Sequence, residues 1–286
     1  MGVLNNIIAA IDTSAMADEV LKRAIALARE KNAQITVLHS IDIPMFEKLF
    51  GEVRGEEAIR QKIEEKMKLL NAEAKVDYLI TITRGDPSDE IVYESDKLQS
   101  DLIIIGAHGK EEIKDTFFGS TVHNVVQRSH LPVLIIKRPY TGDYKNILAP
   151  TDLSETSAKS IRFAKELFTH TDIKLAYAYS QVSDMAMDIY NLHDEKEAYR
   201  KKIRVIEKQD ADKFKKKVGI DTIEVIESFY SVSEAFLKTA EQQHSDLVIL
   251  GAHGVEVSDT ILYASTASFL MRSVPSDVLI YVPLEK

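Results

Sequence analysis

An internal repeat sets the architecture of this chain, because three segments of the first half return in the second. The matching pairs are NIIAAID at 6–12 with NILAPTD at 146–152, SDLIIIGAHG at 100–109 with SDLVILGAHG at 245–254, and PVLII at 132–136 with DVLIY at 277–281. The offset is 140 residues in the first pair and 145 in the other two, so the second copy carries five extra residues. We place them in the polar stretch 185–218. Two copies of this size fit the length of 286 residues, and we expect tandem domains at 1–139 and 144–286.

Each copy alternates short apolar runs with stretches of helical periodicity. In the first copy the predicted strands are Ile7–Ile11, Ile35–His39, Tyr78–Thr83, Leu102–Ile105 and Val133–Ile136. Their nearly unbroken apolar character is typical of strands covered on both faces. Apolar residues recur at helical spacing between them, at Val20, Leu21, Ala24, Ile25 and Ala28 and at Ile59, Ile63, Met67 and Leu70. Ser14 and Ser88 are predicted N-caps. The pattern predicts an α/β fold of two tandem doubly wound, mostly parallel five-stranded sheets with helices on both faces.

Composition narrows the classes of function. The formal net charge of −9 disfavours nucleic-acid binding, which needs a basic surface. The absence of cysteine excludes disulfides, thiolate metal sites and a cysteine nucleophile. No apolar run approaches the roughly 20 residues that span a bilayer, and no secretory signal is visible at the N-terminus. We therefore expect a cytoplasmic protein without a membrane or nucleic-acid partner.

Small and polar residues follow the predicted strands at their carboxyl ends, where parallel sheets bind ligands. Asp12 follows the first strand and could accept hydrogen bonds from a ribose or an adenine, as could Asp42 after the second. The turn Gly85-Asp86-Pro87 follows the third strand. The fourth runs into Gly106 and Gly109, and Gly119-Ser120 opens the last helix after nine more residues. Free amide N–H groups, a hydroxyl and the positive end of a helix dipole are the parts of an anion site.

With these residues in place, the chain resembles the universal stress protein (UspA-type) family over nearly its whole length. The family's nucleotide motif is G-x2-G-x9-G-[S/T], and the first copy matches it completely. The resemblance implies an adenine nucleotide alpha hydrolase-like, Rossmann-like fold and an ATP site, with Mg²⁺ as an optional companion. Carried over by position, the implied cofactor-binding residues are Ala10, Ile11, Asp12, Ser40, Ile41, Gly85, Ile105, Gly106, His108, Gly109, Gly119, Ser120 and Thr121. Family members often dimerise, so we expect the two copies to pack as an intrachain pseudo-dimer, with a homodimer left open.

The second copy departs from this motif. Ala264-Ser265 replaces Gly-Ser, which adds a methyl group where a phosphate should approach the backbone. Tyr230 begins the segment that replaces Gly85-Asp86-Pro87, and its ring could fill the pocket. Asp152 is retained. We expect this copy to bind ATP weakly or not at all.

Each candidate residue also has a purely structural interpretation. Gly106 and Gly109 could form a tight turn, and Asp12 could cap the first helix. His108 and His253 stand between glycines with no partner at metal-ligand spacing, so we interpret them as loop-orienting residues rather than ligands or catalysts. We assign Ser120 to phosphate hydrogen bonding, because no base is identifiable for a nucleophile. No metal site or catalytic residue is predicted.

Two further clusters are given structural interpretations. The basic stretch 200–217 is interpreted as a solvated helix face, and Tyr177, Tyr179 and Tyr190 as packing residues.

Three classes of function follow. The first is a nucleotide-dependent regulatory protein of stress tolerance with an unknown protein partner, binding ATP in the first copy without being an enzyme. The second is a slow Mg²⁺-dependent ATPase or a phosphoryl or nucleotidyl transferase, for which Asp12 and Asp42 are the available carboxylates. The third is an interaction module for a non-nucleotide small ligand or a protein.

Overall fold

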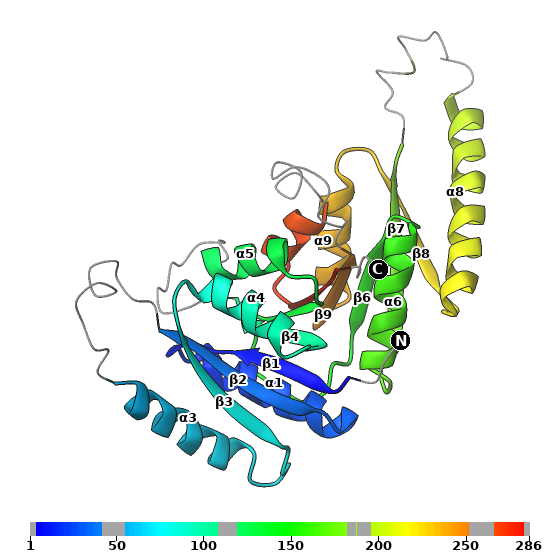
Figure 1. Ribbon diagram of the computed structural model, residues 1–286. Helices are drawn as coiled ribbons and strands as arrows, with labels where there is room; N and C mark the ends of the chain where they lie inside the picture. The colour runs from blue at the N-terminus through cyan, green and yellow to red at the C-terminus, as the bar shows by residue number, and fades with distance from the viewer. Residues whose placement is uncertain are drawn as a thin grey trace. The chain divides into compact units, whose positions relative to one another are not determined.

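The computed structural model describes residues 4–41, 55–107, 119–181, 187, 196–251 and 266–282 (Figure 1). The chain forms two compact units. Unit 1 contains Met1–Asp143 together with Asp277–Lys286, and unit 2 contains Tyr144–Ser276. The last segment of the second sequence copy therefore belongs to the first structural unit.

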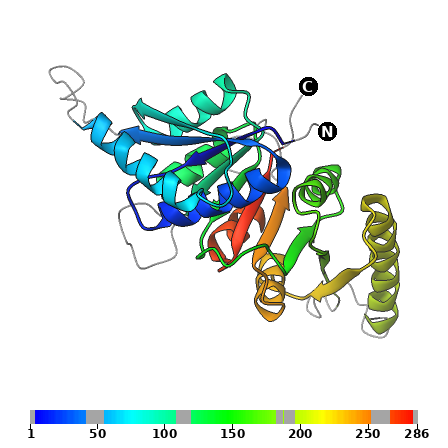
Figure 2. The same ribbon diagram turned by 90° about the horizontal axis from the view of Figure 1, so that it is seen from below.

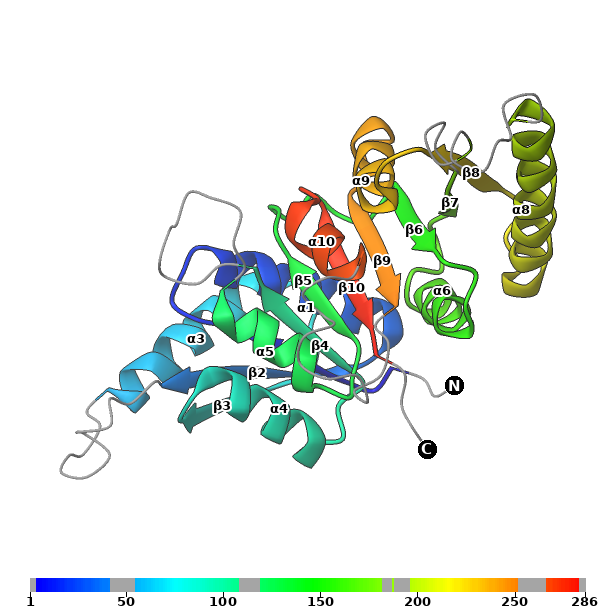
Figure 3. The same cartoon turned by 90° about the horizontal axis from the view of Figure 1, so that it is seen from above.

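The sheet of unit 1 is doubly wound. Its parallel strands are β1 (Asn6–Ala10), β2 (Gln34–Ile41), β3 (Tyr78–Arg84), β4 (Leu102–Gly106) and β5 (Val133–Ile136). They lie in the order β3-β2-β1-β4-β5. A sixth strand, β10 (Asp277–Tyr281), adds antiparallel to β5 (Figure 3). The described side chains of β4 before Gly106 and all those of β5 are buried, as their apolar runs predict.

Helices cover both faces of this sheet. Helices α1 (Met16–Lys31) and α3 (Glu56–Leu70) pack together on one face (Figure 2), and α4 (Pro87–Lys97) and α5 (Ser120–Arg128) pack together on the other. The residues predicted to form the apolar stripe of α1 are all buried: Val20, Leu21, Ala24, Ile25 and Ala28. In α3 only Ile63 and Met67 are buried, since this helix covers the outer strand β3.

The predicted N-caps are wrong in both helices. Ala15 precedes α1 and supplies no side-chain cap, because the Ser14 hydroxyl donates instead to Asp12 Oδ1 at 2.6 Å. Helix α4 is capped by Asp86, whose Oδ1 accepts hydrogen bonds from the backbone N–H of Ser88 at 2.9 Å and of Asp89 at 3.2 Å. Pro87 takes the first helical position, where its missing N–H costs nothing.

Unit 2 repeats the same order with four strands. These are β6 (Ile147–Thr151), β7 (Ile173–Ser180), β8 (Ile223–Ser228) and β9 (Leu247–Gly251), arranged β9-β6-β7-β8 and parallel. Its helices are α6 (Glu155–Leu167) and α8 (Lys196–Val218), which pack together, and α9 (Val232–Gln242) and α10 (Thr266–Ser273), which pack together. The unit is thus a second doubly wound sheet.

The extra residues of the second copy lie between β7 and β8, as predicted. Val37 pairs with Ile80 in unit 1, and Leu175 pairs with Ile223 in unit 2. The offset between the two copies is therefore 138 residues at the second strand and 143 at the third. Helix α8 has 23 residues where its counterpart α3 has 15.

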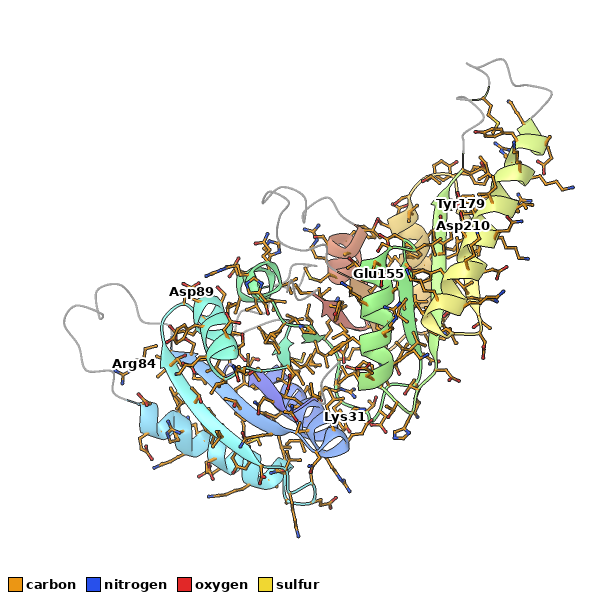
Figure 4. The ribbon with its side chains drawn as sticks, turned by 45° about the vertical axis from the view of Figure 1, so that its right-hand side comes forward. Lys31, Arg84, Asp89, Glu155, Tyr179 and Asp210 are labelled. Atoms are coloured by element: carbon orange, nitrogen blue, oxygen red, sulfur yellow. The ribbon has the colours of Figure 1, made fainter. Side chains whose placement is uncertain are left out.

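The basic stretch 200–217 lies on α8, whose described side chains are mostly exposed. Arg204 bonds Glu227 on β8 at 2.9 Å, and Lys217 pairs with Glu155 on α6. Figure 4 labels Glu155 on α6. Tyr177 donates its hydroxyl to Glu207 of α8 at 2.6 Å, and its ring stacks on Tyr179 at a centroid distance of 6.3 Å. These contacts agree with a solvated helix that packs on tyrosines; Tyr190 lies outside the described residues.

A repeated carboxylate fixes the start of each first strand. Asp101 Oδ2 accepts hydrogen bonds from the backbone N–H groups of Asn5 at 2.7 Å and Asn6 at 2.9 Å. Asp246 does the same for Lys145 at 2.7 Å and Asn146 at 3.0 Å. The recurring Ser-Asp-Leu of the sequence is therefore a structural tie between neighbouring strands. Among the helices of the described residues, none combines the length and the apolar character needed to cross a membrane.

Candidate functional site

The carboxyl edge of the unit 1 sheet contains the point where the strand order reverses. Strand β1 lies between β2 and β4, and Ala10 is paired with Leu38 on one side and Ile105 on the other. The chain leaves β1 for α1 on one face of the sheet and leaves β4 for α5 on the opposite face. Loops that diverge in this way open a crevice at the edge, where such folds bind ligands.

Asp12 stands at this edge and shapes the turn into α1. Its Oδ1 accepts hydrogen bonds from the Ser14 backbone N–H at 2.9 Å and from the Ser14 hydroxyl at 2.6 Å. Within the described residues its Oδ2 has no hydrogen-bond partner. Asp12 thus orders the turn before α1, but the interpretation that it caps this helix is wrong, because the N-cap is Ala15 and no side chain caps it.

His39 fixes the backbone next to Asp12, and the sequence analysis did not identify it as a site residue. The ring is buried, and its Nδ1 lies 2.9 Å from the carbonyl oxygen of Ile11. The Ile11 backbone N–H also donates to Leu38 O at 2.9 Å. Both backbone groups of Ile11 are thus held by β2. A polar residue inside an otherwise apolar strand is the one signal that could have found His39.

Ser40 and Gly85 bind each other. The Ser40 hydroxyl donates to the carbonyl oxygen of Gly85 at 3.0 Å, and the Gly85 backbone N–H donates to Ile41 O at 3.1 Å. Gly85 itself is buried. These three predicted site residues are therefore brought together, and their polar groups tie the end of β2 to the turn before α4.

Gly106 is required by the packing of α1. A Cβ placed there would lie 2.8 Å from Met16 Cγ and 3.6 Å from Val20 Cγ2. Unit 2 has the same arrangement, since a Cβ on Gly251 would lie 3.1 Å from Thr156 Cγ2. The first glycine of the repeated motif is thus explained by close contact between helix and strand in both units.

Gly119 differs from Gly106. Its φ is −57°, and among the described residues a Cβ there would meet only Ala107 O, at 3.9 Å. Nothing in the described fold excludes a side chain at this position. Its backbone N–H donates to Ala107 O at 3.3 Å, which holds the start of α5 against the end of β4.

The first turn of α5 contains no acidic residue. The N-cap of this helix, Gly119, supplies no side-chain hydrogen bond. By contrast α4, α6 and α9 are capped by the side chains of Asp86, Ser154 and Ser231. Ser120 is exposed and Thr121 half-exposed. Uncapped amides, the helix dipole and two hydroxyls suit an anion.

Several predicted residues cannot be placed. His108, Gly109 and Asp42 lie outside the described residues, as do the departures of the second copy at 264–265 and His253. In the residues that the structure does describe, no group of three or more His, Asp or Glu side chains is arranged to hold a metal ion.

The corresponding edge of unit 2 begins with Asp152. Its Oδ1 accepts hydrogen bonds from the Ser154 backbone N–H at 3.0 Å and the Ser157 hydroxyl at 2.6 Å. Burial opposes ionisation of this carboxyl, but these hydrogen bonds outweigh it and lower its pKa. The expectation that Tyr230 fills the pocket is wrong, because the residue is 96% exposed. Ser231 caps α9, which leaves the preceding ring in solvent.

The fold is that of a doubly wound α/β protein. Comparison with known proteins identifies its family. The universal stress protein family model matches residues 4–137 and again 143–282, so the chain belongs to this family and contains its domain twice.

Individual relatives agree with this assignment. The universal stress protein MJ0531 of Methanocaldococcus jannaschii is 31% identical over 134 residues, which cover 45% of this chain and 79% of that protein. The universal stress protein YxiE of Bacillus subtilis is 30% identical over 150 residues, covering 47% of this chain and 100% of that protein. The crystal structure of a universal stress protein from Archaeoglobus fulgidus covers 98% of this chain and 96% of its own, at 20% identity and a TM-score of 0.68. This last likeness supports the fold of the whole tandem chain.

Proposed function

We propose that this protein is an ATP-binding regulator of stress tolerance that holds the nucleotide in unit 1. The observation that carries the proposal is the start of α5. It offers amides without a side-chain cap and hydroxyls beside Gly119, at which the described residues leave room for a side chain. A glycine that the fold does not require is best explained by a ligand that passes close to the backbone.

The residues at this edge fit the parts of the nucleotide. The amides at the start of α5 and the Ser120 hydroxyl suit the phosphates. Asp12 keeps one oxygen for a ribose hydroxyl, and Ile11 presents a backbone fixed by His39. We propose Mg²⁺ only as a companion of the phosphates.

We propose binding rather than turnover. Phosphoryl transfer requires groups that hold a metal and orient a nucleophile. The described part of this edge offers donors for phosphate and the carboxylates of Asp12, whose Oδ1 is already used by Ser14, and of Asp86, whose Oδ1 caps α4. The arrangement supports holding a nucleotide while a partner protein reads the occupied state.

Substitution of Gly119 tests the phosphate site. We expect Gly119→Ala to weaken ATP binding and Gly119→Val to abolish it, measured by calorimetry on the full chain, because each added group occupies the space of a phosphate. Ala264→Val, at the corresponding place of the second copy, is the matched control and should leave the affinity unchanged. Equal ATP affinity in Gly119→Val and the unmodified protein would show that the phosphates do not bind at Gly119.

The identity of the ligand is a separate question. We expect mass spectrometry of the purified, non-denatured protein to detect ATP or another adenine nucleotide bound to it. A lipid-like or other non-nucleotide ligand in its place would favour the interaction-module class instead.

A further inference from the structure

The β5 edge of unit 1 is closed by the last strand of the same chain. The facing pairs are Val278 with Ile135, Leu279 with Leu134 and Ile280 with Val133. All six side chains are at most 2% exposed. If the β5 edge were open, it could pair with a strand of another chain. The sequence must therefore favour the correct partner strand.

The two paired strands are the corresponding strands of the two sequence copies. VLII at 133–136 matches VLIY at 278–281, at the offset of 145 residues. A second copy of the chain could therefore present its own β5 in place of β10. In the same register Leu134 would then face Leu134 of the second copy. The apolar side chains alone discriminate little between these two partners.

Asp277 and Tyr281 distinguish β10 from β5, where the first copy has Pro132 and Ile136, and the hydrogen bonds to β5 described below come from Asp277. Its side chain is 3% exposed, and its Oδ1 accepts hydrogen bonds from the backbone N–H of Lys137 at 2.8 Å and of Arg138 at 3.2 Å. The first copy has Pro132 at the corresponding position, which has no acceptor side chain. A second copy's β5 would thus leave both amides without this carboxylate.

The charge of Lys137 also favours β10 over the β5 strand of a second copy. Burial lowers the pKa of its amine to about 8, against the opposing charge of Asp277. In a symmetric pair of β5 strands the attraction between Lys137 and Asp277 would be lost.

We propose that Asp277 makes the β5 edge selective for the chain's own last strand and excludes the β5 strand of a second copy. Removal of the carboxylate should raise the fraction of β5–β5 paired dimers about tenfold or more, since buried hydrogen bonds to charged groups carry this much selectivity.

The chain has no cysteine, so a single introduced thiol reports the pairing. In Leu134→Cys, a disulfide between two chains forms only if β5 pairs with β5. We expect no cross-linked dimer after mild oxidation of this variant, and abundant dimer when Asp277→Pro is added. Leu134→Cys combined with Leu279→Cys should form an intrachain cross-link, because these residues face each other.

Two further variants keep the test decisive. Asp277→Asn retains the shape of the side chain and one acceptor oxygen, and it should give an intermediate dimer fraction if Asp277→Pro fails to fold. Asp246→Asn is the matched control, since Asp246 also accepts two backbone N–H groups and is distant from β5 in sequence. Cross-linked dimer in Leu134→Cys alone, or its absence from folded Asp277→Pro and Asp277→Asn variants, would overturn the proposal.

Discussion

Two glycines of one sequence motif are glycine for different reasons. A side chain at position 106 would clash with Met16 of α1, whereas the described residues leave space for a side chain at position 119. The sequence predicted both positions from their spacing but could not separate these causes, because Met16 and Gly106 are 90 residues apart and meet only in the fold. His39 was missed for a similar reason, since its partner is a backbone carbonyl of another strand.

This difference predicts that alanine at the two positions changes the free energy of unfolding in urea by different amounts. Gly106→Ala should lower the free energy of unfolding by about 1–3 kcal/mol through overpacking against Met16. Gly119→Ala should change it by no more than about 0.5 kcal/mol. Adding Met16→Ala to Gly106→Ala should recover part of the loss. Equal destabilisation by the two glycine substitutions would show that Gly119 is also held by the fold.

At the scale of the element, periodicity predicted the helices of unit 1 well and their first residues poorly. The apolar stripe of α1 is buried as predicted, because its spacing depends only on the helix itself. The caps depend on which nearby side chain reaches the free amides. Asp86 accepts hydrogen bonds from the first free amides of α4, and Ser88 lies inside that helix. The Ser14 hydroxyl donates to Asp12 and therefore does not cap α1.

The cap of α4 predicts a pH dependence of stability. The Ser88 hydroxyl, assisted by the backbone N–H groups of Ser88 and Asp89, lowers the pKa of the Asp86 carboxyl below 3.8. A lowered carboxyl pKa stabilises the folded state fully above the ordinary value and loses this contribution as the pH falls below it. Asp86→Ala should therefore cost about 1 kcal/mol near neutral pH.

Urea unfolding across a pH series checks this prediction. The difference between the unmodified protein and Asp86→Ala should shrink once the pH falls below the ordinary carboxyl value of 3.8. Asp86→Asn serves as a control, because asparagine is an equally good cap without a titrating group. A difference that stays constant through the acid range would contradict this account of the cap.

For the whole molecule, the repeat predicted two tandem domains and the motif resemblance predicted the family, and the family match at 4–137 and 143–282 confirms the family and its repetition. The structure pairs β10 with β5 of unit 1, and no local pattern predicts this, because the partner of a strand is set by the fold. ATP binding, its unequal strength in the two copies and the domain limits 1–139 and 144–286 stay predictions.

The shared strand predicts that unit 1 depends on the end of the chain. Truncation after Ser276 should uncover β5, lower the urea midpoint of unit 1 and promote aggregation detectable by light scattering. Truncation after Val282 keeps β10 and should behave like the full chain. Superimposable unfolding curves for both truncated proteins would show that unit 1 is stable without β10.

The stoichiometry of nucleotide binding tests the proposal that ATP binds in unit 1 and not equally in both units. Equilibrium binding of a labelled ATP analogue to the full chain should saturate at one molecule per chain, bound in unit 1 and released by unlabelled ATP. Saturation at two equal sites, or no binding at all, would contradict it.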